Sequence, residues 1–307
     1  MKKPQRLLVV KPSSLGDVVQ ALQVVAALKQ QRPDLAVDWV VRDCFAEIVQ
    51  NSGLVDRVFP FHRSLLGLLS CCRAIHFSEK FFAVWDMQGL LRSGLMTMAA
   101  HAGRKIGRSD ARELAGLFCR ETVPLPKKHP PHHAVEILME FLPSLGLERA
   151  IANLTFTPVA SAFAIASPYV LIAPESRVAA KVWPHHRALT DHLCRCHPRW
   201  TFVWIGQGRG GGTPQRSNFL DLRGRTSLSQ LPALVQNSLG VVANDSGCGH
   251  LAAALGRPNL TLFMETDSAR FAPYPPGGIG HFVAHNPPPL FVELEQFSNF
   301  LQKLAPR

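Results

Sequence analysis

The segment Lys11-Pro12-Ser13-Ser14-Leu15-Gly16-Asp17 is the first whose residue types could do chemistry. It places the carboxylate of Asp17 and the hydroxyls of Ser13 and Ser14 between an apolar run and a helical pattern. An acid in the first turn complements the helix dipole, and a serine there caps the helix. The same carboxylate is equally suited to act as a general base that takes a proton from an attacking hydroxyl, with the serines contacting the ligand. Spacing alone leaves both interpretations open.

The segment from Asn244 to His250 joins a carboxylate, a hydroxyl and two glycines at the expected start of a helix. Unpaired amides and the helix dipole attract anionic oxygens there, and glycine lets the backbone approach them closely. Asp245, Ser246 and Gly247 therefore suit a pyrophosphate, and His250 could add a donor. The alternative is that Asp245 or Ser246 is only an N-cap.

Two shorter features belong to the same half of the chain. Lys181 precedes an expected helix, where it either lies over phosphates as a mobile charge or is an ordinary surface lysine. The segment from Gly206 to Gly211 matches G-x-G-x-x-G but lacks the helix entry and the acidic residue of an NAD site. We interpret it as a glycine loop lining a cleft. Because no D-x-D pair is present to hold a divalent ion, Lys181 and the helix start at Ser246 must stabilise any leaving group.

Eight basic residues against three acids lie between Arg92 and Lys128, most densely around Arg104, Arg108 and Arg112. Such a cluster is either a solvated face or a site for a phosphorylated or carboxylated acceptor. Aromatic residues are not interleaved with it, which argues against a nucleic-acid surface.

Metal binding is also disfavoured by the sequence. His129, His132 and His133 lie beside prolines in no ligand spacing, so we expect neither a metal site nor a cofactor.

Alternating elements must position these residues. Leu7 to Val10 predicts a buried parallel strand, Asp17 to Lys29 a helix and Ala36 to Val41 a second strand. Further strands are expected at 57–61, 82–86, 121–124, 169–173, 201–205, 240–243 and 259–263, with helices at 44–51, 89–101, 133–145, 184–195 and 249–255.

This order predicts two α/β domains of the doubly wound Rossmann type, residues 1–160 and 161–307, facing each other across a cleft. A final helix at 293–304 is expected to pack back on the first domain. Ligands of such folds bind at the carboxyl ends of the strands.

Composition narrows the class of protein. Of the 307 residues, 47% are apolar and 18% charged, which favours a packed globular protein. Lys and Arg outnumber Asp and Glu by 33 to 22, so anionic partners are favoured without a choice among them. Seven cysteines without a C-x-x-C pair indicate reduced thiols in a cytoplasm. The apolar run behind the basic start is too short for a signal peptide or membrane span, so any membrane contact is expected to be peripheral.

Together these segments resemble the heptosyltransferase family, glycosyltransferase family 9. The resemblance rests on the order and spacing of residues 11–17, of Lys181-Val182-Trp183-Pro184, and of Asp245-Ser246-Gly247 with His250. Similarity to the members that add the first heptose to Kdo comes from further stretches, at 86–93, 111–113 and 133–136.

The resemblance implies a GT-B fold and a metal-independent, inverting transfer of heptose from ADP-heptose to the Kdo region of lipopolysaccharide. It implies a cytoplasmic enzyme with an anionic, lipid-linked acceptor and peripheral contact with the inner membrane. A sugar-nucleotide epimerase or hydrolase on the same fold, or a non-catalytic nucleotide-sugar or polyanion-binding protein, is the alternative.

Residue roles follow from the same resemblance. Asp17 is then the base. The donor-binding residues are Ser176, Lys181, Gly206, Asp245, Ser246, Gly247 and His250, and the acceptor-binding residues are Ser13, Ser14, Gln88, Arg92, Arg104, Arg108 and Arg112.

Two departures from the family pattern stand out. Pro174-Glu175-Ser176-Arg177 replaces a small or hydroxylated pair, which leaves only Ser176 to carry over. The family has an acidic residue after the strand that ends near Gly206, where it is expected to hold the ribose. This chain has no clear counterpart there, and Gln207 and Gln215 are the nearest polar candidates.

Overall fold

A computed structural model describes residues 4–127, 130–157, 159, 163–166, 168–208, 212–288 and 291–304, without the side chain of Val292. The chain divides into two compact units, residues 1–157 and 158–307. The boundary expected at residue 160 falls outside the described residues, as do His129 and residues 209–211 of the glycine loop. Each unit is an α/β domain built on one parallel sheet.

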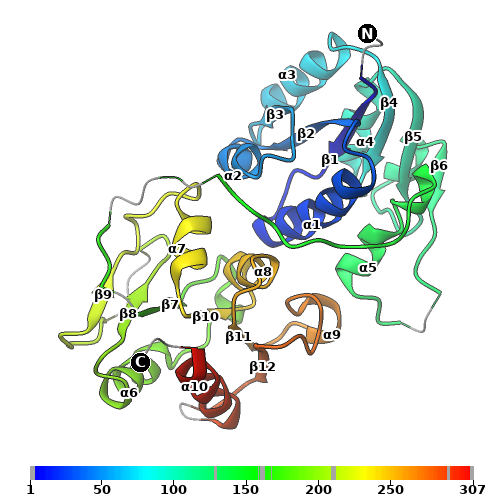
Figure 1. Cartoon of the computed structure of the whole chain (residues 1–307). Helices are drawn as coiled ribbons and strands as arrows, with labels where there is room; N and C mark the ends of the chain where they lie inside the picture. Colours follow the sequence, from blue (N-terminus) through cyan, green and yellow to red (C-terminus); the bar gives the residue numbers. More distant parts are fainter. Residues whose placement is uncertain are drawn as a thin grey trace. The chain divides into compact units, whose positions relative to one another are not determined.

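The first unit contains six strands in the order β3-β2-β1-β4-β5-β6, all parallel (Figure 1). They are β1 (Arg6–Val10), β2 (Ala36–Arg42), β3 (Arg57–Phe61), β4 (Phe81–Asp86), β5 (Ala102–Arg108) and β6 (Glu121–Val123). Its helices are α1 (Leu15–Gln31), η1 (Asp43–Phe45), α2 (Ala46–Asn51), α3 (Leu65–His76), α4 (Leu91–Ala99), η2 (Ala115–Phe118), α5 (Ala134–Met139) and η3 (Pro143–Leu145).

Successive side chains of β1 point to opposite faces of this sheet. Leu8 and Val10 pack with Ile75 of α3 and Met96 of α4 in one buried cluster. On the other side, α1 contacts α5. All four apolar residues at 7–10 are fully buried, which explains why this strand is a continuous apolar run in the sequence.

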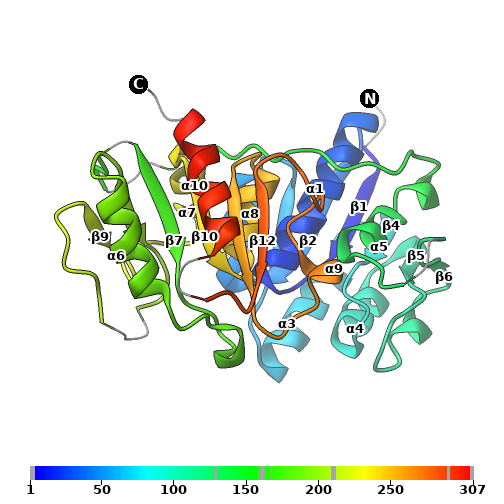
Figure 2. The same cartoon turned by 90° about the horizontal axis from the view of Figure 1, so that it is seen from below.

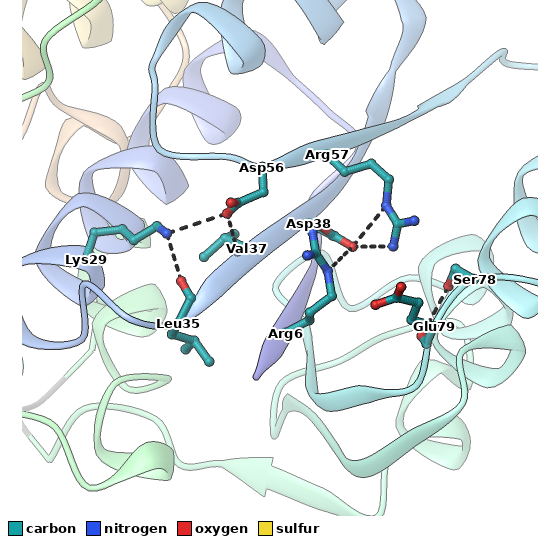
Figure 3. Close-up of polar contacts among 9 residues, drawn as sticks. All are labelled: Arg6, Lys29, Leu35, Val37, Asp38, Asp56, Arg57, Ser78 and Glu79. Carbon is teal, nitrogen blue, oxygen red and sulfur yellow. Dashed lines mark hydrogen bonds and ion pairs between the residues drawn. The ribbon is translucent and has the colours of Figure 1, made fainter. Parts of the chain in front are cut away.

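A polar cluster closes the amino-terminal edge of this sheet. Asp38 of β2 is fully buried and accepts hydrogen bonds from the guanidinium groups of Arg6, at the start of β1, and Arg57, at the start of β3 (Figure 3). Beside it, Lys29 donates to the carbonyl of Leu35 and pairs with Asp56, 3.5 Å between Nζ and Oδ2. These contacts fix the three adjacent strand starts, so the opposite edge is the one left for ligands.

The second unit repeats the same topology, with its strands in the order β12-β11-β10-β7-β8-β9 (Figure 2). They are β7 (Tyr169–Ala173), β8 (Thr201–Trp204), β9 (Phe219–Asp221), β10 (Gly240–Asn244), β11 (Asn259–Phe263) and β12 (His281–His285). Its helices are η4 (Ala179–Lys181), α6 (His186–Cys196), α7 (Leu231–Asn237), α8 (Gly247–Ala254), α9 (Ser268–Phe271) and α10 (Val292–Leu304).

The last helix, α10, contributes to the core of the second unit. Phe297 and Leu301 of α10 are buried in the core cluster that holds Ile172 of β7 and Leu193 of α6. The apolar face of this helix therefore packs on the second unit's own sheet.

Strand β5 and helix α3 of the first unit were not predicted. Strand β5 has three basic residues and two glycines among its seven, so it lacks the apolar run of a buried strand. Helix α3 is apolar on its buried face and on much of its exposed face, so it lacks the polar stripe that marks an amphipathic helix.

Candidate active site

The chemistry-bearing residues follow strands that flank the point where each sheet reverses its strand order. In the first unit this point lies between β1 and β4, and in the second between β7 and β10. Asp17 and Gln88 follow β1 and β4, whereas Lys181 and Asp245 follow β7 and β10. Ligands of doubly wound sheets bind at such positions, outside the carboxyl ends of the strands.

Asp17 is held on two sides by its own turn. Its Oδ2 accepts the backbone N–H of Ser14, at 2.9 Å, and the Ser14 hydroxyl, at 2.7 Å. Its Oδ1 lies 3.3 Å from Nζ of Lys11. The side chain of Asp17 remains 41% exposed, whereas that of Lys11 is 2% exposed. One oxygen therefore completes a capping arrangement, and the carboxylate still reaches solvent.

Opposing forces act on the pKa of Asp17. Burial of the group raises the pKa, but the charge of Lys11 and the hydrogen bonds from Ser14 and Lys11 outweigh burial and lower the pKa to about 2. Asp17 is thus an anion at neutral pH. The capping and the catalytic interpretations of Asp17 are compatible, since both need an ionised carboxylate at this position.

Lys11 was not singled out in the sequence, although it is the largest buried polar side chain of this site. Its carbonyl accepts the indole N–H of Trp39, at 3.2 Å, which anchors the end of β1. Burial lowers the pKa of Lys11, while the nearby charges of Asp17 and Asp86 raise it. A lysine directly after a buried strand has no periodicity signal that marks it as buried.

The turn after β4 is organised by Asp86. Its carboxylate accepts the N–H groups of Gln88 and Gly89 and the hydroxyl of Ser93. Burial raises the pKa of Asp86, and these hydrogen bonds oppose the rise. The Oε1 atom of Gln88 is buried without a hydrogen-bond partner among the described residues, which leaves it an acceptor for a ligand.

The structure brings most of the predicted acceptor-binding arginines to this edge. Arg92 lies in the first turn of α4, above the ring of Phe61. Arg108 ends β5, acts electrostatically on Lys11 and pairs with Asp110, at 2.7 Å. The N–H of Arg112 donates to the carbonyl of Gly89, which joins the loop after β5 to the turn after β4.

Arg104 does not join this group. It lies early in β5, pairs with Glu121 and donates to the carbonyl of Ser144. These contacts fasten β5 to β6 and to the turn at Ser144, and the place of Arg104 in the acceptor set stays a prediction.

In the second unit, Lys181 and Asp245 form an ion pair with 2.6 Å between Nζ and Oδ2. Asp245 directly follows β10 and is 7% exposed, whereas Lys181 is 31% exposed. The pair joins the loops after β7 and β10. It leaves the ammonium group accessible to an anion at the switch point of this sheet.

The start of α8 lies beside this pair. Ser246 is its N-cap residue, and its hydroxyl is buried without a hydrogen-bond partner among the described residues. Gly247 is the first helical residue and His250 follows in the first turn. A cap hydroxyl that does not bond its own helix is available, with the helix amides, to phosphate oxygens.

Buried contacts fix the neighbouring backbone. The Oδ1 atom of Asn244 accepts the N–H of Trp183 and lies 3.0 Å from Nε2 of His186. Burial lowers the pKa of His186 to about 4, which the hydrogen bond to Asn244 opposes, so this imidazole is neutral at physiological pH. These contacts set the register between the Lys181 segment and the end of β10.

A carboxylate missed by the sequence reasoning lies at the end of β8. Glu175 is 15% exposed; its Oε2 accepts the N–H of Gln207, at 2.7 Å, and its Oε1 lies 3.5 Å from Nη1 of Arg223. Gly206 has φ of +154°, and a Cβ there would lie 2.6 Å from the Glu175 carboxylate. Glu175 follows a different strand, so no local spacing could have assigned it to this position. Ser176 lies beside it and accepts the N–H of Val178.

Comparison with known proteins shows the family to which the chain belongs. A family profile described as glycosyltransferase family 9 (heptosyltransferase) matches residues 76–299. Lipopolysaccharide heptosyltransferase 1 of Salmonella typhimurium is 31% identical over 294 residues, which cover 88% of this chain and 91% of that protein. The chain belongs to glycosyltransferase family 9.

Solved structures of heptosyltransferases have the same fold. The E. coli heptosyltransferase WaaC with ADP has a TM-score of 0.78 at 25% identity, covering 98% of this chain and all of the other. E. coli ADP-heptose lps heptosyltransferase II has a TM-score of 0.78 at 17% identity, covering 98% and 99%. The predicted GT-B fold and the resemblance to heptosyltransferases are therefore confirmed, and the chain is a glycosyltransferase.

The described residues also bear on membrane spans and metal binding. None of their helices has the length and apolar character needed to cross a membrane. The described part of the chain also contains no cluster of three His, Cys, Asp or Glu side chains that could hold a metal ion.

Proposed function

We propose that this family 9 glycosyltransferase moves a heptose from ADP-heptose to the Kdo region of the lipopolysaccharide inner core, with inversion at the anomeric carbon. The names of its relatives support the reaction, and the solved WaaC structures hold ADP and ADP-2-deoxy-2-fluoro heptose. The observation that carries the mechanism is an ionised, partly exposed Asp17 at the switch point of the first sheet.

Asp17 acts as the general base for an acceptor hydroxyl. The oxygen of that hydroxyl forms a bond to the anomeric carbon while the bond from that carbon to the β-phosphate oxygen breaks. A carboxylate with a pKa of about 2 is too weak to ionise a free hydroxyl. The hydroxyl becomes strongly acidic only as the new bond forms, so the proton passes to Asp17 late in the displacement.

The second unit holds the leaving ADP. Its diphosphate binds to the accessible ammonium group of Lys181, the hydroxyl of Ser246 and the helix amides that begin at Gly247. His250 is a further hydrogen-bond donor to the same group. Asp245 positions Lys181 through their ion pair. The charge that develops on the leaving oxygen is then stabilised without a metal ion.

Glu175 holds the ribose hydroxyls in this proposal, in the position where Gln207 and Gln215 offered no carboxylate. The support is its placement against Gly206 and Gln207, at the carboxyl end of β8. Its attachment to the N–H of Gln207 and to Arg223 fixes the carboxylate in place before any ligand arrives.

The acceptor lies over the first sheet. Gln88, Arg92, Arg108 and Arg112 supply an amide and three guanidinium groups at the edge that also bears Asp17, with Ser13 and Ser14 in the intervening turn. Guanidinium groups bind carboxylates in two-point contacts, which suits the acid group of Kdo. The proposal thus includes an anionic lipid-linked acceptor, a cytoplasmic enzyme and peripheral contact with the inner membrane.

An assay of ADP release tests the proposal. The enzyme should release ADP from ADP-heptose only when a Kdo-bearing acceptor is present, and ADP-heptose should protect it from thermal unfolding more than UDP-sugars do. A ligand at 100 times its Kd adds about 2.7 kcal/mol to the free energy of unfolding. Equal ADP release without acceptor would indicate a hydrolase, and binding without any acceptor-dependent release would indicate a non-catalytic protein.

A further inference from the structure

Six exposed leucines gather at the carboxyl-terminal edge of the first sheet. Leu65, Leu66 and Leu69 lie in α3, Leu91 begins α4, and Leu114 and Leu117 flank the start of η2. These elements follow β3, β4 and β5, so all three leave the sheet at the same edge. Helices α3 and α4 contact each other and run together along the lower side of Figure 2. We refer to these six residues as the leucine edge.

The exposure of these side chains is unusual for surface residues. Leu66 and Leu117 are each 78% exposed and Leu114 is 72% exposed. The opposite face of α3 is already buried through Cys71 and Ile75 in the domain core. Because α4 contacts both α3 and η2, these exposed apolar side chains lie on adjoining elements, and exposed apolar patches mark interaction surfaces.

The backbone of the η2 loop holds one of these leucines outward under strain. Glu113 and Leu114 have positive φ angles of 54° and 61°, a region that residues other than glycine seldom occupy. The Glu113 carboxylate accepts the N–H of Leu91, at 3.2 Å, which ties this loop to the start of α4. Strained backbone persists where the surrounding structure imposes it, and such sites are commonly functional.

The charge around the leucine edge favours one class of partner. Three exposed arginines lie in or just before these elements: Arg63 before α3, Arg92 in α4 and Arg112 before η2. The nearby acids are already engaged, because Asp110 pairs with Arg108 and Glu113 bonds to Leu91. Arginines beside exposed leucines complement a surface that is anionic outside and apolar beneath. A second copy of the chain would instead bring like charges together across a two-fold axis.

We propose that the leucine edge inserts into the headgroup region of an anionic phospholipid bilayer and presents the acceptor-binding edge of the first sheet to that surface. The benefit of such docking rests on the proposed function, because a lipid-linked acceptor must reach Asp17 from the bilayer. Leu65 and Leu66 follow β3 at the edge where Asp17 follows β1, so docking here would orient the site toward the acceptor.

Vesicle binding without any substrate tests this proposal. The wild-type enzyme should bind vesicles of phosphatidylglycerol and phosphatidylethanolamine, bind phosphatidylcholine vesicles about tenfold more weakly, and dissociate as salt is raised. The paired variants Leu66→Gln/Leu69→Gln and Leu114→Gln/Leu117→Gln should each lower binding at least about tenfold. Thermal unfolding of each variant checks that it folds.

The matched control is Phe77→Gln. Phe77 is 76% exposed but follows the far end of α3, about 18 Å along the helix from Leu65. This variant should bind vesicles like the wild type. An equal loss in Phe77→Gln, or wild-type binding by both paired variants, would overturn the leucine edge as the docking surface. Failure of the wild type to bind anionic vesicles would also overturn the proposal. A change of self-association in the paired variants would then assign the leucine edge to a contact between copies of the chain.

A second readout separates this inference from the proposed function. With a deacylated, water-soluble acceptor, the paired variants should keep their turnover within about twofold of the wild type, whereas turnover on the same acceptor embedded in vesicles should fall with binding. Vesicle binding by an enzyme that transfers no heptose would refute the proposed function and leave the docking surface standing. Normal heptose transfer on the vesicle-embedded acceptor, unchanged in the paired variants, would refute the docking surface and leave the proposed function standing.

Discussion

At the scale of single residues, each unit holds one partly buried ion pair beside its switch point. Lys11 and Asp17 share one pair, in which the lysine is buried and the carboxylate reaches solvent. Lys181 and Asp245 share the other, in which the carboxylate is buried and the lysine is accessible. The exposed member of each pair is the one suited to a ligand: an anionic base in the first unit and a cation for phosphates in the second.

The first prediction concerns the pH dependence that Lys11 imposes. The folded-state pKa of Asp17 is depressed, so the base form is present above about pH 2 and is lost only below it. The acid side of the wild-type kcat/KM profile should therefore stay flat at every pH where the protein is folded. In Lys11→Met the lowering charge disappears while burial remains, so the acid limb should move to higher pH.

The matched control for this profile is Lys80→Met, which removes an exposed lysine of the same unit. It should leave the acid limb unchanged. A Lys11→Met profile as flat as that of the wild type would show that Lys11 does not set the ionisation of the base.

Lys181→Met carries the second prediction. Loss of a charge-assisted contact to phosphate costs about 1.5–3 kcal/mol, so the Kd for ADP should rise about 10- to 100-fold by calorimetric titration. Lys303→Met, at the exposed end of α10, provides the comparison with equal change of net charge. If both variants bound ADP like the wild type, Lys181 would be a surface lysine with no role in the donor site.

Residue types and positions made Asp17, Lys181 and Asp245 candidates with structural alternatives, and the family resemblance favoured the functional interpretation. It could not indicate that Lys11 is buried against Asp17 or that Glu175 reaches the end of β8, since both contacts depend on the folding of separate loops onto one another. Arg104 shows a similar limit, because a basic cluster in the sequence does not show that one of its members pairs with Glu121.

At the scale of elements, buried strands could be predicted from the sequence, whereas two elements of the first unit with unusual patterns could not. Strand positions were predictable where strands are buried on both faces, as in β1 and β7, because such strands are continuous apolar runs. Strand β5 and helix α3 escaped prediction because a basic strand and an apolar exposed helix violate the usual periodicities. Strand β5 ends and helix α3 begins at the carboxyl-terminal edge of the sheet, where the proposed acceptor and bilayer contacts lie.

The third prediction tests the amino-terminal edge. Asp38 is fully buried and receives two guanidinium groups that themselves remain partly exposed. Asp38→Asn should lower the free energy of unfolding by about 2 kcal/mol or more in urea titrations, because it removes the charge that both arginines pair with. Asp34→Asn, which breaks the exposed pair with Arg32, should leave the unfolding midpoint unchanged. Equal midpoints for both variants would contradict a structural role for the Asp38 cluster.

At the scale of the whole molecule, the chain consists of two Rossmann-like units with the same strand order, each with its chemistry at its own switch point. The proposal divides the reaction between them, with the base and acceptor contacts in the first unit and the leaving group in the second. Changes in one unit should therefore separate from changes in the other: Lys181→Met should weaken donor binding, whereas a change at Asp17 should leave donor binding intact.

The rate of acceptor-dependent ADP release by Asp17→Asn, at saturating donor, tests the account most directly. Asparagine keeps the size of the side chain and removes the base, so the rate should fall by about 10²- to 10⁴-fold while the Kd for ADP stays at the wild-type value. A rate within about threefold of the wild type, at unchanged donor affinity, would show that Asp17 only caps its helix and that the transfer uses another base.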